Sequence, residues 1–382
     1  MKQRKHLLVL DPTAFAGGSK VATATLLNTL DPDKIVVTVL SADPQSWRKT
    51  TYQCLHLYQP KCLSRREQGL PYFLRHSFIA LCIIFARLRR GRIDIALGAS
   101  GPGVDLALFL VKPWLGFRLV QMVHGPVARS RTIARCLRVA DQVHYLESSK
   151  DSLLSALSID QASRQECLGQ QFSPLPNALD PTCWPTPCQR QTPVVFWAAS
   201  LLKWKGLDTL LAALQYMAPT QRPPSHICYI QPVDCALPVS RAPISISGVH
   251  WHENPHQLDA LRSSANIFVS TSVMEPFGLS ILEAMAAGHC VLIPTDGAYW
   301  DRTLSDNVNC IKYRADDAED LSAKLLALSH DMVQIVRLGK AAAKMASNYR
   351  ADSQFATIKN SLEILPTTAT QATISTSGEW PE

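Results

Sequence analysis

The feature that most constrains the fold is a repeated alternation of apolar segments with helical patterns. In the first half of the chain, each segment that we expect to form a strand is apolar along almost its whole length. These segments are HLLVLD (6–11), KIVVTVL (34–40), DIALGAS (94–100), RLVQMVHG (118–125) and DQVHYLESS (141–149). Strands that are apolar on both faces are typical of parallel sheets covered by helices on each side. The first half is therefore predicted to be a doubly wound α/β domain.

The alternation starts again after a proline-rich segment, 173–193, which we interpret as an interdomain linker. Further strands are expected at 194–200, 226–230, 244–247, 266–270 and 290–294, with helices from about 207 and 255 and at 279–287. The predicted domains are 1–180 and 181–350, followed by a helix at 351–365 that crosses back to the first domain and a disordered polar tail at 366–382. Ligands of such domains bind at the carboxyl ends of the strands, so a cleft between the two domains is the expected site.

The positive charge of the chain is concentrated in its first half. Residues 1–180 hold 23 Lys and Arg against 13 Asp and Glu, a net of +10, whereas the whole chain has a net charge of +7. This asymmetry indicates that the first domain meets an anionic surface or ligand. Arginines interleave with apolar residues over 48–92, and we predict a membrane or acceptor patch at Arg65, Arg66, Arg87, Arg89 and Arg90. The alternative is a buried helix with a basic last turn, and no recognised module for nucleic-acid binding is present.

The apolar runs do not indicate a secretory signal or a membrane span. The run after the basic start stops after about four residues, which is short for a signal peptide. The longest run, 78–86, is too short to cross a bilayer. We therefore expect a cytoplasmic protein, with peripheral contact on the inner face of the cytoplasmic membrane.

Two glutamates flank a tight turn in the segment MEPFGLSILEAMAAGHCVLIP (274–294). Glu275 lies in the loop before the expected helix, and Glu283 lies about one turn inside it. The first amides of that helix, near Gly278, Leu279 and Ser280, have no partner within the helix, so with the helix dipole they form an anion site. A carboxylate on each side suits a ligand with a diphosphate in its middle and hydroxyl-bearing sugars at both ends. The alternative is that Glu283 is a surface residue and Glu275 caps the helix.

This segment, residues 270–297, resembles the E-x7-E signature of the retaining glycosyltransferases of family 4, which have the GT-B fold. That fold is α/β, with two Rossmann-like doubly wound domains that face each other across a cleft. The resemblance also covers residues 175–180, 197–214, 246–270 and 306–313. It implies a retaining hexosyltransferase that moves a sugar from a UDP- or GDP-linked donor to a glycan or polyprenyl-diphosphate-linked acceptor, in bacterial envelope or exopolysaccharide biosynthesis. It also implies that neither a metal nor another cofactor is needed.

The resemblance assigns roles to individual residues. His124, at the end of a strand, and Glu275 are implied to be catalytic, although a lone histidine at such a place is also compatible with a structural role. Ser200 stands where the family has an arginine, which weakens the expected diphosphate clamp because serine has no charge; Lys203 is a candidate substitute. The implied donor-binding residues are Gly17, Gly18, Ser200, Lys203, Lys205, Val249, Phe277, Gly278, Leu279 and Glu283.

Other interpretations of the sequence remain open. A nucleotide-sugar epimerase can share the two-domain fold, and the serine at position 200 is compatible with a non-catalytic subunit that binds a partner enzyme. Two segments have metal-ligand spacing, Asp31-Pro32-Asp33 and the histidines at 250, 252 and 256. We expect the first to form a turn and the second to lie in a loop without a metal.

Overall fold

A computed structural model describes residues 4–14, 17–47, 52–60, 69–160, 168–232 and 237–363. The tail predicted at 366–382 lies outside the described residues, and so do Arg65 and Arg66 of the predicted basic patch.

The first domain contains a parallel sheet with the strand order β3-β2-β1-β4-β5-β6-β7. Its order reverses between β1 and β4, which is the switch point of a doubly wound sheet. The strands are β1 (Lys5–Asp11), β2 (Ile35–Ser41), β3 (Gln53–His56), β4 (Ile95–Gly98), β5 (Arg118–Val123), β6 (Gln142–Tyr145) and β7 (Phe172–Pro174).

Alternate residues of β1 enter different cores, as a sheet that is buried on both faces requires. Leu8 and Leu10 pack in a core that also contains residues of the helices between β3 and β7. Leu7 and Val9 pack in the core on the other face, with residues of the helix after β1. The helices are α1 (Gly18–Asn28), α3 (Gly69–Arg90), α4 (Leu106–Leu115), α5 (Arg131–Val139) and α6 (Lys150–Leu157).

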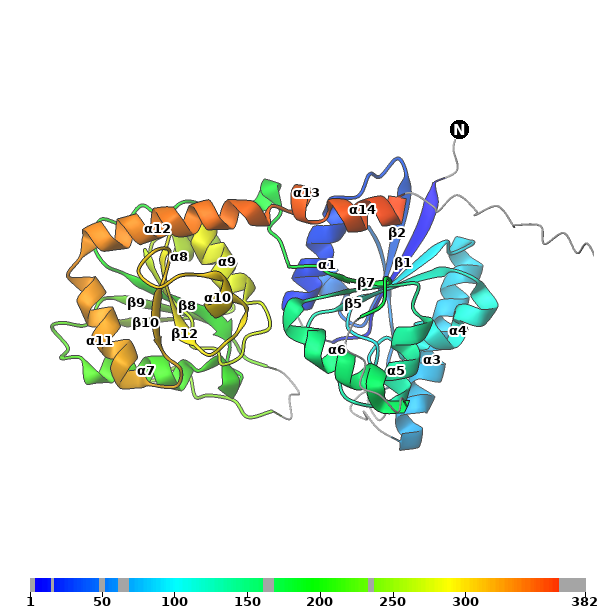
Figure 1. Ribbon diagram of the computed structural model, residues 1–382, viewed down its shortest axis with the longest axis horizontal. Helices are drawn as coiled ribbons and strands as arrows, with labels where there is room; N and C mark the ends of the chain where they lie inside the picture. The colour runs from blue at the N-terminus through cyan, green and yellow to red at the C-terminus, as the bar shows by residue number, and fades with distance from the viewer. Residues whose placement is uncertain are drawn as a thin grey trace, which may run out of the picture.

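The second domain repeats this topology with the order β10-β9-β8-β11-β12-β13, and its switch point lies between β8 and β11. Figure 1 shows the two sheets side by side, each with helices around it. The strands are β8 (Val195–Ser200), β9 (Ser225–Ile230), β10 (Val249–Glu253), β11 (Ile267–Val269), β12 (Cys290–Thr295) and β13 (Ile311–Arg314). The helices are α7 (Leu207–Tyr216), α8 (Leu258–Ser263), α9 (Leu279–Ala286), α10 (Tyr299–Thr303), α11 (Ala318–Ser329) and α12 (Met332–Ala346). The predicted fold class, two doubly wound α/β domains, is confirmed.

The chain then returns to the first domain through α13 (Ala351–Gln354) and α14 (Ala356–Glu363). In Figure 1 the long helix α12 runs along the second domain, and α14 lies against the first. Phe355, Ile358 and Leu362 are buried in the same core as Leu7 and Val9 of β1. The last helix is therefore part of the first domain's packing.

One predicted strand is wrong. Residues 244–247 form no strand, and the edge strand of the second sheet is β10, which begins after Gly248. The alternation Ile-Ser-Ile-Ser suggested a half-buried strand, and Ile244 and Ile246 do pack on the core. The segment stays outside the sheet ladder, however, and the indole Nε1 of Trp251 donates a hydrogen bond to the carbonyl of Ile244. The alternating pattern therefore correctly indicated that the segment is partly buried, but it wrongly indicated that the segment pairs with a neighbouring strand.

Candidate active site

Two loops of the second domain meet at its switch point. The loop after β8 carries Lys205 and Gly206, and the loop after β11 begins with Ser270 and Thr271. Gly206 has a φ of 71°, and a Cβ at this position would lie 2.1 Å from the carbonyl oxygen of Thr271. Glycine is therefore required for two reasons, the left-handed backbone and the closeness of the second loop.

Lys205 and Glu275 form an ion pair across these loops. The distance from Lys205 Nζ to Glu275 Oε2 is 2.5 Å, and the two side chains are only 18% and 16% exposed. The ammonium group also lies 3.9 Å from the centre of the Trp204 ring, in cation–π geometry. The structure thus brings together two residues that the sequence placed in the site, and it shows that they neutralise each other.

Lys203, the candidate substitute for the missing arginine, is directed elsewhere. Its Nζ lies 2.6 Å from Asp208 Oδ2, and the side chain is 58% exposed. Ser200 ends β8, is partly exposed, and its hydroxyl forms no hydrogen bond with the described part of the chain. The expectation that Lys203 replaces the arginine charge is therefore not met in this structure, because Asp208 already pairs with it.

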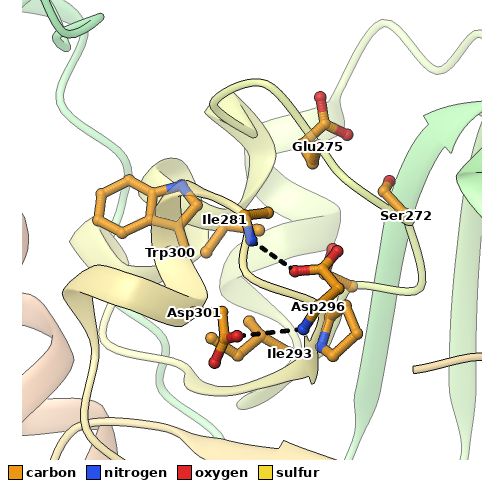
Figure 2. Close-up of a pocket in the computed structure, with 10 residues that line it drawn as sticks. Ser272, Glu275, Ile281, Ile293, Asp296, Trp300 and Asp301 are labelled. Carbon is orange, nitrogen blue, oxygen red and sulfur yellow. Dashed lines mark hydrogen bonds between the residues drawn. The ribbon is translucent and has the colours of Figure 1, made fainter. Parts of the chain in front are cut away.

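Asp296 holds the loop that presents Glu275. Met274 has a left-handed φ of 51°, and its amide donates to Asp296 Oδ2 at 2.6 Å. The other oxygen of Asp296 accepts from the amide of Ala298, and Asp301 accepts from the amide of Asp296. Figure 2 shows Asp296 and Asp301 in one small pocket with Glu275 near its edge. The sequence analysis missed Asp296, and its position directly after strand β12 was the only available signal.

Phe277 is a structural anchor rather than a side chain that can contact a ligand. It is 2% exposed, and its ring packs against Tyr299, Trp300 and Tyr349. Trp300 also donates a hydrogen bond from Nε1 to the carbonyl of Gly278 at 3.2 Å. Phe277 can therefore contact a ligand only through its backbone.

The amino end of α9 presents free amides. Gly278 precedes the helix with a φ of 78°, and its carbonyl accepts from the amides of Ile281 and Leu282. The amides of Leu279 and Ser280 have no acceptor among the described residues. Together with the positive end of the helix dipole, they make this end of α9 suitable for an anion, and the anion site stays a prediction.

The amino end of α1 from the first domain lies beside this anion site. Gly17 precedes α1, and a Cβ at Gly18 would lie 3.6 Å from Leu279 Cδ1. On the other side, a Cβ at Gly278 would lie 3.1 Å from Glu275 Cγ. The glycines of the first loop, the start of α9 and the Lys205–Glu275 pair are therefore contiguous, although they come from two domains.

Arg262 orients Glu283, and the sequence analysis did not find it. Its Nη2 lies 2.6 Å from Glu283 Oε2, and its Nη1 lies 2.8 Å from Asp259 Oδ1. The side chain of Arg262 is 7% exposed. Burial raises the pKa of Glu283, and the charge of Arg262 opposes this shift. In the sequence, Arg262 is one arginine of a short helix with no mark of its burial.

Two other predicted residues belong to strands that do not carry this cluster, β5 and β10. His124 directly follows β5, and its Nε2 is buried without a partner among the described residues. Burial lowers the pKa of His124 to about 4, so the ring is neutral at pH 7. Val249 is the first residue of β10 and packs on the core. It therefore lies at the amino end of its strand, opposite the edge where the site loops emerge, and we remove it from the donor-binding set.

The two segments with metal-ligand spacing make other contacts. Asp31 accepts a hydrogen bond from the amide of Asp33 and pairs with Lys34, as a turn residue does. His252 Nε2 lies 3.1 Å from His226 Nδ1. Within the ranges that the structure describes, no group of three or more His, Cys, Asp or Glu side chains could hold a metal ion.

Residues 192–331 match the family model of the glycosyl transferases group 1. The second domain is therefore similar to the glycosyl transferases group 1. Lys205, Arg262, Glu275, Glu283 and Asp296 all lie within the matched range. No curated protein matches the chain by sequence.

Solved structures of the GT-B fold resemble the whole chain. HepE from Anabaena, in complex with UDP and glucose, has a TM-score of 0.71 at 15% identity, covering 94% of this chain and 99% of HepE. Sucrose-phosphate synthase from Thermosynechococcus elongatus has a TM-score of 0.69 at 15% identity, with 93% and 97% covered. A glycosyltransferase from Rickettsia africae has a TM-score of 0.67 at 14% identity, with 94% and 98% covered. The fold of the chain is therefore GT-B.

Proposed function

We propose that this protein is a retaining glycosyltransferase that transfers a hexose from a UDP- or GDP-linked donor to a glycan or lipid-linked glycan acceptor. The observation that carries the proposal is the meeting of the amino ends of α1 and α9 beside Lys205. Two helix dipoles, two free amides and one lysine favour an anion of high charge at this place. The complex of HepE with UDP and glucose supports a UDP-linked sugar as the first donor to test.

The proposed donor pose follows from the positions of the charges. The diphosphate lies at the amides of Leu279 and Ser280, the ribose lies towards Glu283, and the transferred sugar lies towards Glu275. Lys205 is paired with Glu275 in the free protein. The diphosphate must therefore replace Glu275 as the partner of Lys205. Glu275 is then released to accept hydrogen bonds from sugar hydroxyls. Donor binding thus prepares both groups in one exchange.

The same groups stabilise the reaction. As the bond between the anomeric carbon and the diphosphate breaks, negative charge grows on the leaving oxygen. Lys205 and the α9 amides are oriented towards that charge before the reaction, which is the usual way enzymes lower such barriers. The acceptor hydroxyl attacks from the face that the diphosphate leaves, and a diphosphate oxygen takes its proton. The neutral ring of His124 can hydrogen-bond a sugar hydroxyl, and we expect no metal to be needed for these steps.

The cellular role follows from the proposed acceptor. A glycan carried on a polyprenyl diphosphate would place the enzyme in the cytoplasm, in bacterial envelope or exopolysaccharide biosynthesis. The basic first domain supports an anionic acceptor of this kind.

Calorimetry with UDP and GDP tests the donor site. We expect the wild-type protein to bind one of them and Lys205→Met to bind it at least about tenfold more weakly, because a charge-assisted contact is lost. Lys203→Met is the matched control, since Lys203 pairs with Asp208 and should bind as the wild type does. If the wild-type protein binds neither nucleotide, the proposal fails and a non-catalytic subunit becomes the better interpretation.

The retaining stereochemistry needs a separate measurement. Incubation with the nucleotide sugar and an acceptor, followed by NMR of the new linkage, should show the anomeric configuration of the donor. An inverted anomer contradicts the proposed same-face attack. Release of a free epimerised sugar without any acceptor would indicate the epimerase instead.

A further inference from the structure

Helix α3 presents an apolar stripe to solvent. Its exposed apolar residues are spaced by four, seven, four and three positions, so they lie near one line along the helix, with the exposed Ser77 within the seven-residue step. The stripe consists of Leu70, Leu74, Leu81, Phe85 and Leu88, which are between 51% and 79% exposed, with Phe73 beside it at 46%. A helix on the surface of a globular protein normally carries polar residues on its outer face. A contiguous exposed stripe of this size indicates an interaction surface.

The opposite side of α3 fixes the helix to the domain. His76, Ile79, Ala80, Ile83 and Ala86 are buried, and most of them belong to the main core of the first domain. With 22 residues, α3 is long and apolar enough to cross a membrane by length and composition alone. Crossing would remove this inner face from the core and place Arg75 in hydrocarbon. The stripe is therefore available only to a partner that approaches from outside.

The surroundings of the stripe are strongly basic. Helices α3, α4 and α5 cover one face of the first sheet, contact one another in sequence and contribute to one core. None of the three contains an acidic residue. Their basic residues are Arg75, Arg87, Arg89, Arg90, Lys112, Arg131, Arg135 and Arg138.

An exposed tryptophan lies at the end of α3 where the arginines gather. Trp114, near the end of α4, is 76% exposed. Arg87 Nη1 donates to the carbonyl of the next residue, Leu115, which places the two helix ends together. A tryptophan beside arginines at the end of an apolar stripe is typical of side chains that lie at the boundary of lipid headgroups and acyl chains.

We propose that the outer face of α3, with Trp114 and the arginines around it, docks on a bilayer that contains anionic lipids. The stripe from Leu70 to Leu88 is roughly 27 Å long, at about 1.5 Å per residue, and would lie flat in the interface. Leucine and phenylalanine side chains enter the acyl region, and the arginines contact the headgroups. This inference does not rest on the proposed sugar transfer, because docking requires no donor.

A second copy of the chain fits the face less well. If two α3 stripes packed together, Arg87, Arg89 and Arg90 of each copy would face a partner helix that has no acidic residue to pair with them. Nucleic acid would neutralise the arginines, but it offers no apolar surface of comparable length to cover the leucines. Anionic lipid satisfies both requirements at once.

Flotation of the full chain with vesicles tests the proposal. We expect binding to phosphatidylcholine vesicles that contain 30% phosphatidylglycerol, and little binding to pure phosphatidylcholine. The double substitution Leu81→Glu/Phe85→Glu should lower the partition coefficient at least tenfold, because it places two acids in the stripe. Arg89→Ala/Arg90→Ala should lower it by about 25-fold, at about fivefold for each basic residue near the surface.

The matched control changes an exposed apolar pair in the other domain. Val333 and Val336 on α12 are 81% and 45% exposed, and Val333→Glu/Val336→Glu should bind vesicles as the wild type does. All variants should keep the wild-type melting temperature and UDP affinity, so a loss of lipid binding is separable from a loss of fold or of the donor site. The proposal is overturned if the wild type does not bind anionic vesicles at low salt, or if the α3 variant binds them equally well. It is also overturned if light scattering shows a dimer that Leu81→Glu/Phe85→Glu dissociates while neither protein binds lipid.

Discussion

Each glutamate of the 274–294 segment faces one cation, and the two cations differ in burial: the side chain of Lys205 is 18% exposed and that of Arg262 is 7% exposed. Glu275 meets Lys205 at the edge of the cleft, whereas Glu283 meets Arg262, whose side chain is almost fully buried. A buried guanidinium cannot move away easily, so it holds Glu283 in one position, and its charge opposes the rise that burial causes in the pKa of Glu283. Lys205 is less buried than Arg262 and has a longer flexible stem, so we expect it to exchange its carboxylate for another anion more readily. The same residue type is thus fixed at one position and exchangeable at the other.

We predict that the two glutamates affect different kinetic constants. Glu283→Gln should raise the donor KM about tenfold with little change in kcat, because it weakens ribose binding in ground state and transition state alike. Glu275→Gln should mainly lower kcat. Steady-state kinetics with the donor varied would measure both, and the reverse pattern would show that the two roles are exchanged.

Arg262→Met should reproduce the KM effect and also change its pH dependence. Without the guanidinium, nothing opposes the effect of burial, so the pKa of Glu283 rises further above its ordinary value. Protonation then removes the carboxylate at a higher pH, and the acid limb of kcat/KM moves upward. Glu283→Gln is the control, because it has no carboxylate at this position to titrate. An acid limb that stays in place in Arg262→Met contradicts the assignment.

The sequence indicated that both glutamates belong to the site, but it did not predict the cation that each one pairs with. The spacing of Glu275 and Glu283 around a Pro-Phe-Gly turn was visible in the chain itself. Arg262 belongs to a different helix, α8, and reaches Glu283 only because α8 and α9 lie side by side in the fold. Ion pairs of this kind depend on tertiary packing, which no local pattern encodes.

At the level of elements, the contact between the β8 and β11 loops determines where Lys205 can lie. Gly206 permits that contact, since a Cβ there would lie 2.1 Å from Thr271 O. Thr271 Oγ1 also donates to the carbonyl of Lys205 at 2.8 Å, and Trp197 Nε1 donates to Thr271 Oγ1 at 3.0 Å. The lysine backbone is therefore held from the second loop.

Gly206→Ala should destabilise the protein more than a glycine replacement whose only cost is the strain of a left-handed backbone. Gly248→Ala is the matched control, because Gly248 has a φ of 80° and a Cβ there would meet nothing within 4 Å. A left-handed alanine costs about 1–2 kcal/mol. In urea unfolding, Gly206→Ala should lower the free energy of unfolding more than Gly248→Ala does. It should also weaken UDP binding, whereas Gly248→Ala should not. Equal losses for both variants would contradict the importance of the loop contact.

Elements with long apolar patterns were predicted well, and short edge elements were not. The central strands β1, β2, β5 and β8 have apolar runs that only a doubly covered sheet explains. By contrast, β3 has four residues, pairs only with β2 and has no buried residue, so its sequence carries little signal. The error at 244–247 has the same cause, since an edge segment can be apolar without joining the ladder.

At the level of the whole molecule, the chain passes between the domains twice, and the second passage supports the first domain. Glu363 at the end of α14 accepts a hydrogen bond from the amide of Asp31, and its Oε2 lies 3.1 Å from Lys34 Nζ. Where the chain first leaves this domain, Asn28 of α1 donates to Asp180 at 3.0 Å. The sequence predicted a helix at 351–365, but the face it covers depends on the arrangement of both sheets. The α14 contacts therefore connect the last described helix to the turn after α1.

Phe355→Ala should therefore lower the stability of the first domain, although Phe355 follows the second domain in sequence. The ring is 1% exposed, and its removal from a packed core costs about 3–5 kcal/mol. In calorimetric melting, a ligand raises only the transition of the domain that binds it. The proposed nucleotide contacts, Lys205, Glu283 and the α9 amides, lie in the second domain, so UDP should raise mainly that transition. Phe355→Ala should lower the other transition.

Phe268→Ala provides the matched comparison for this assignment. Phe268 is also 1% exposed, but it packs in a core of the second domain with Phe196 and Phe277. Its removal should lower the transition that UDP raises and leave the first-domain transition in place. If Phe355→Ala instead lowers the UDP-sensitive transition, α13 and α14 stabilise the second domain and the crossing has no structural effect on the first. Residues 351–363 would then belong to the second domain, as their order along the chain suggests. The packing of Phe355 with β1 predicts instead that they belong to the first domain.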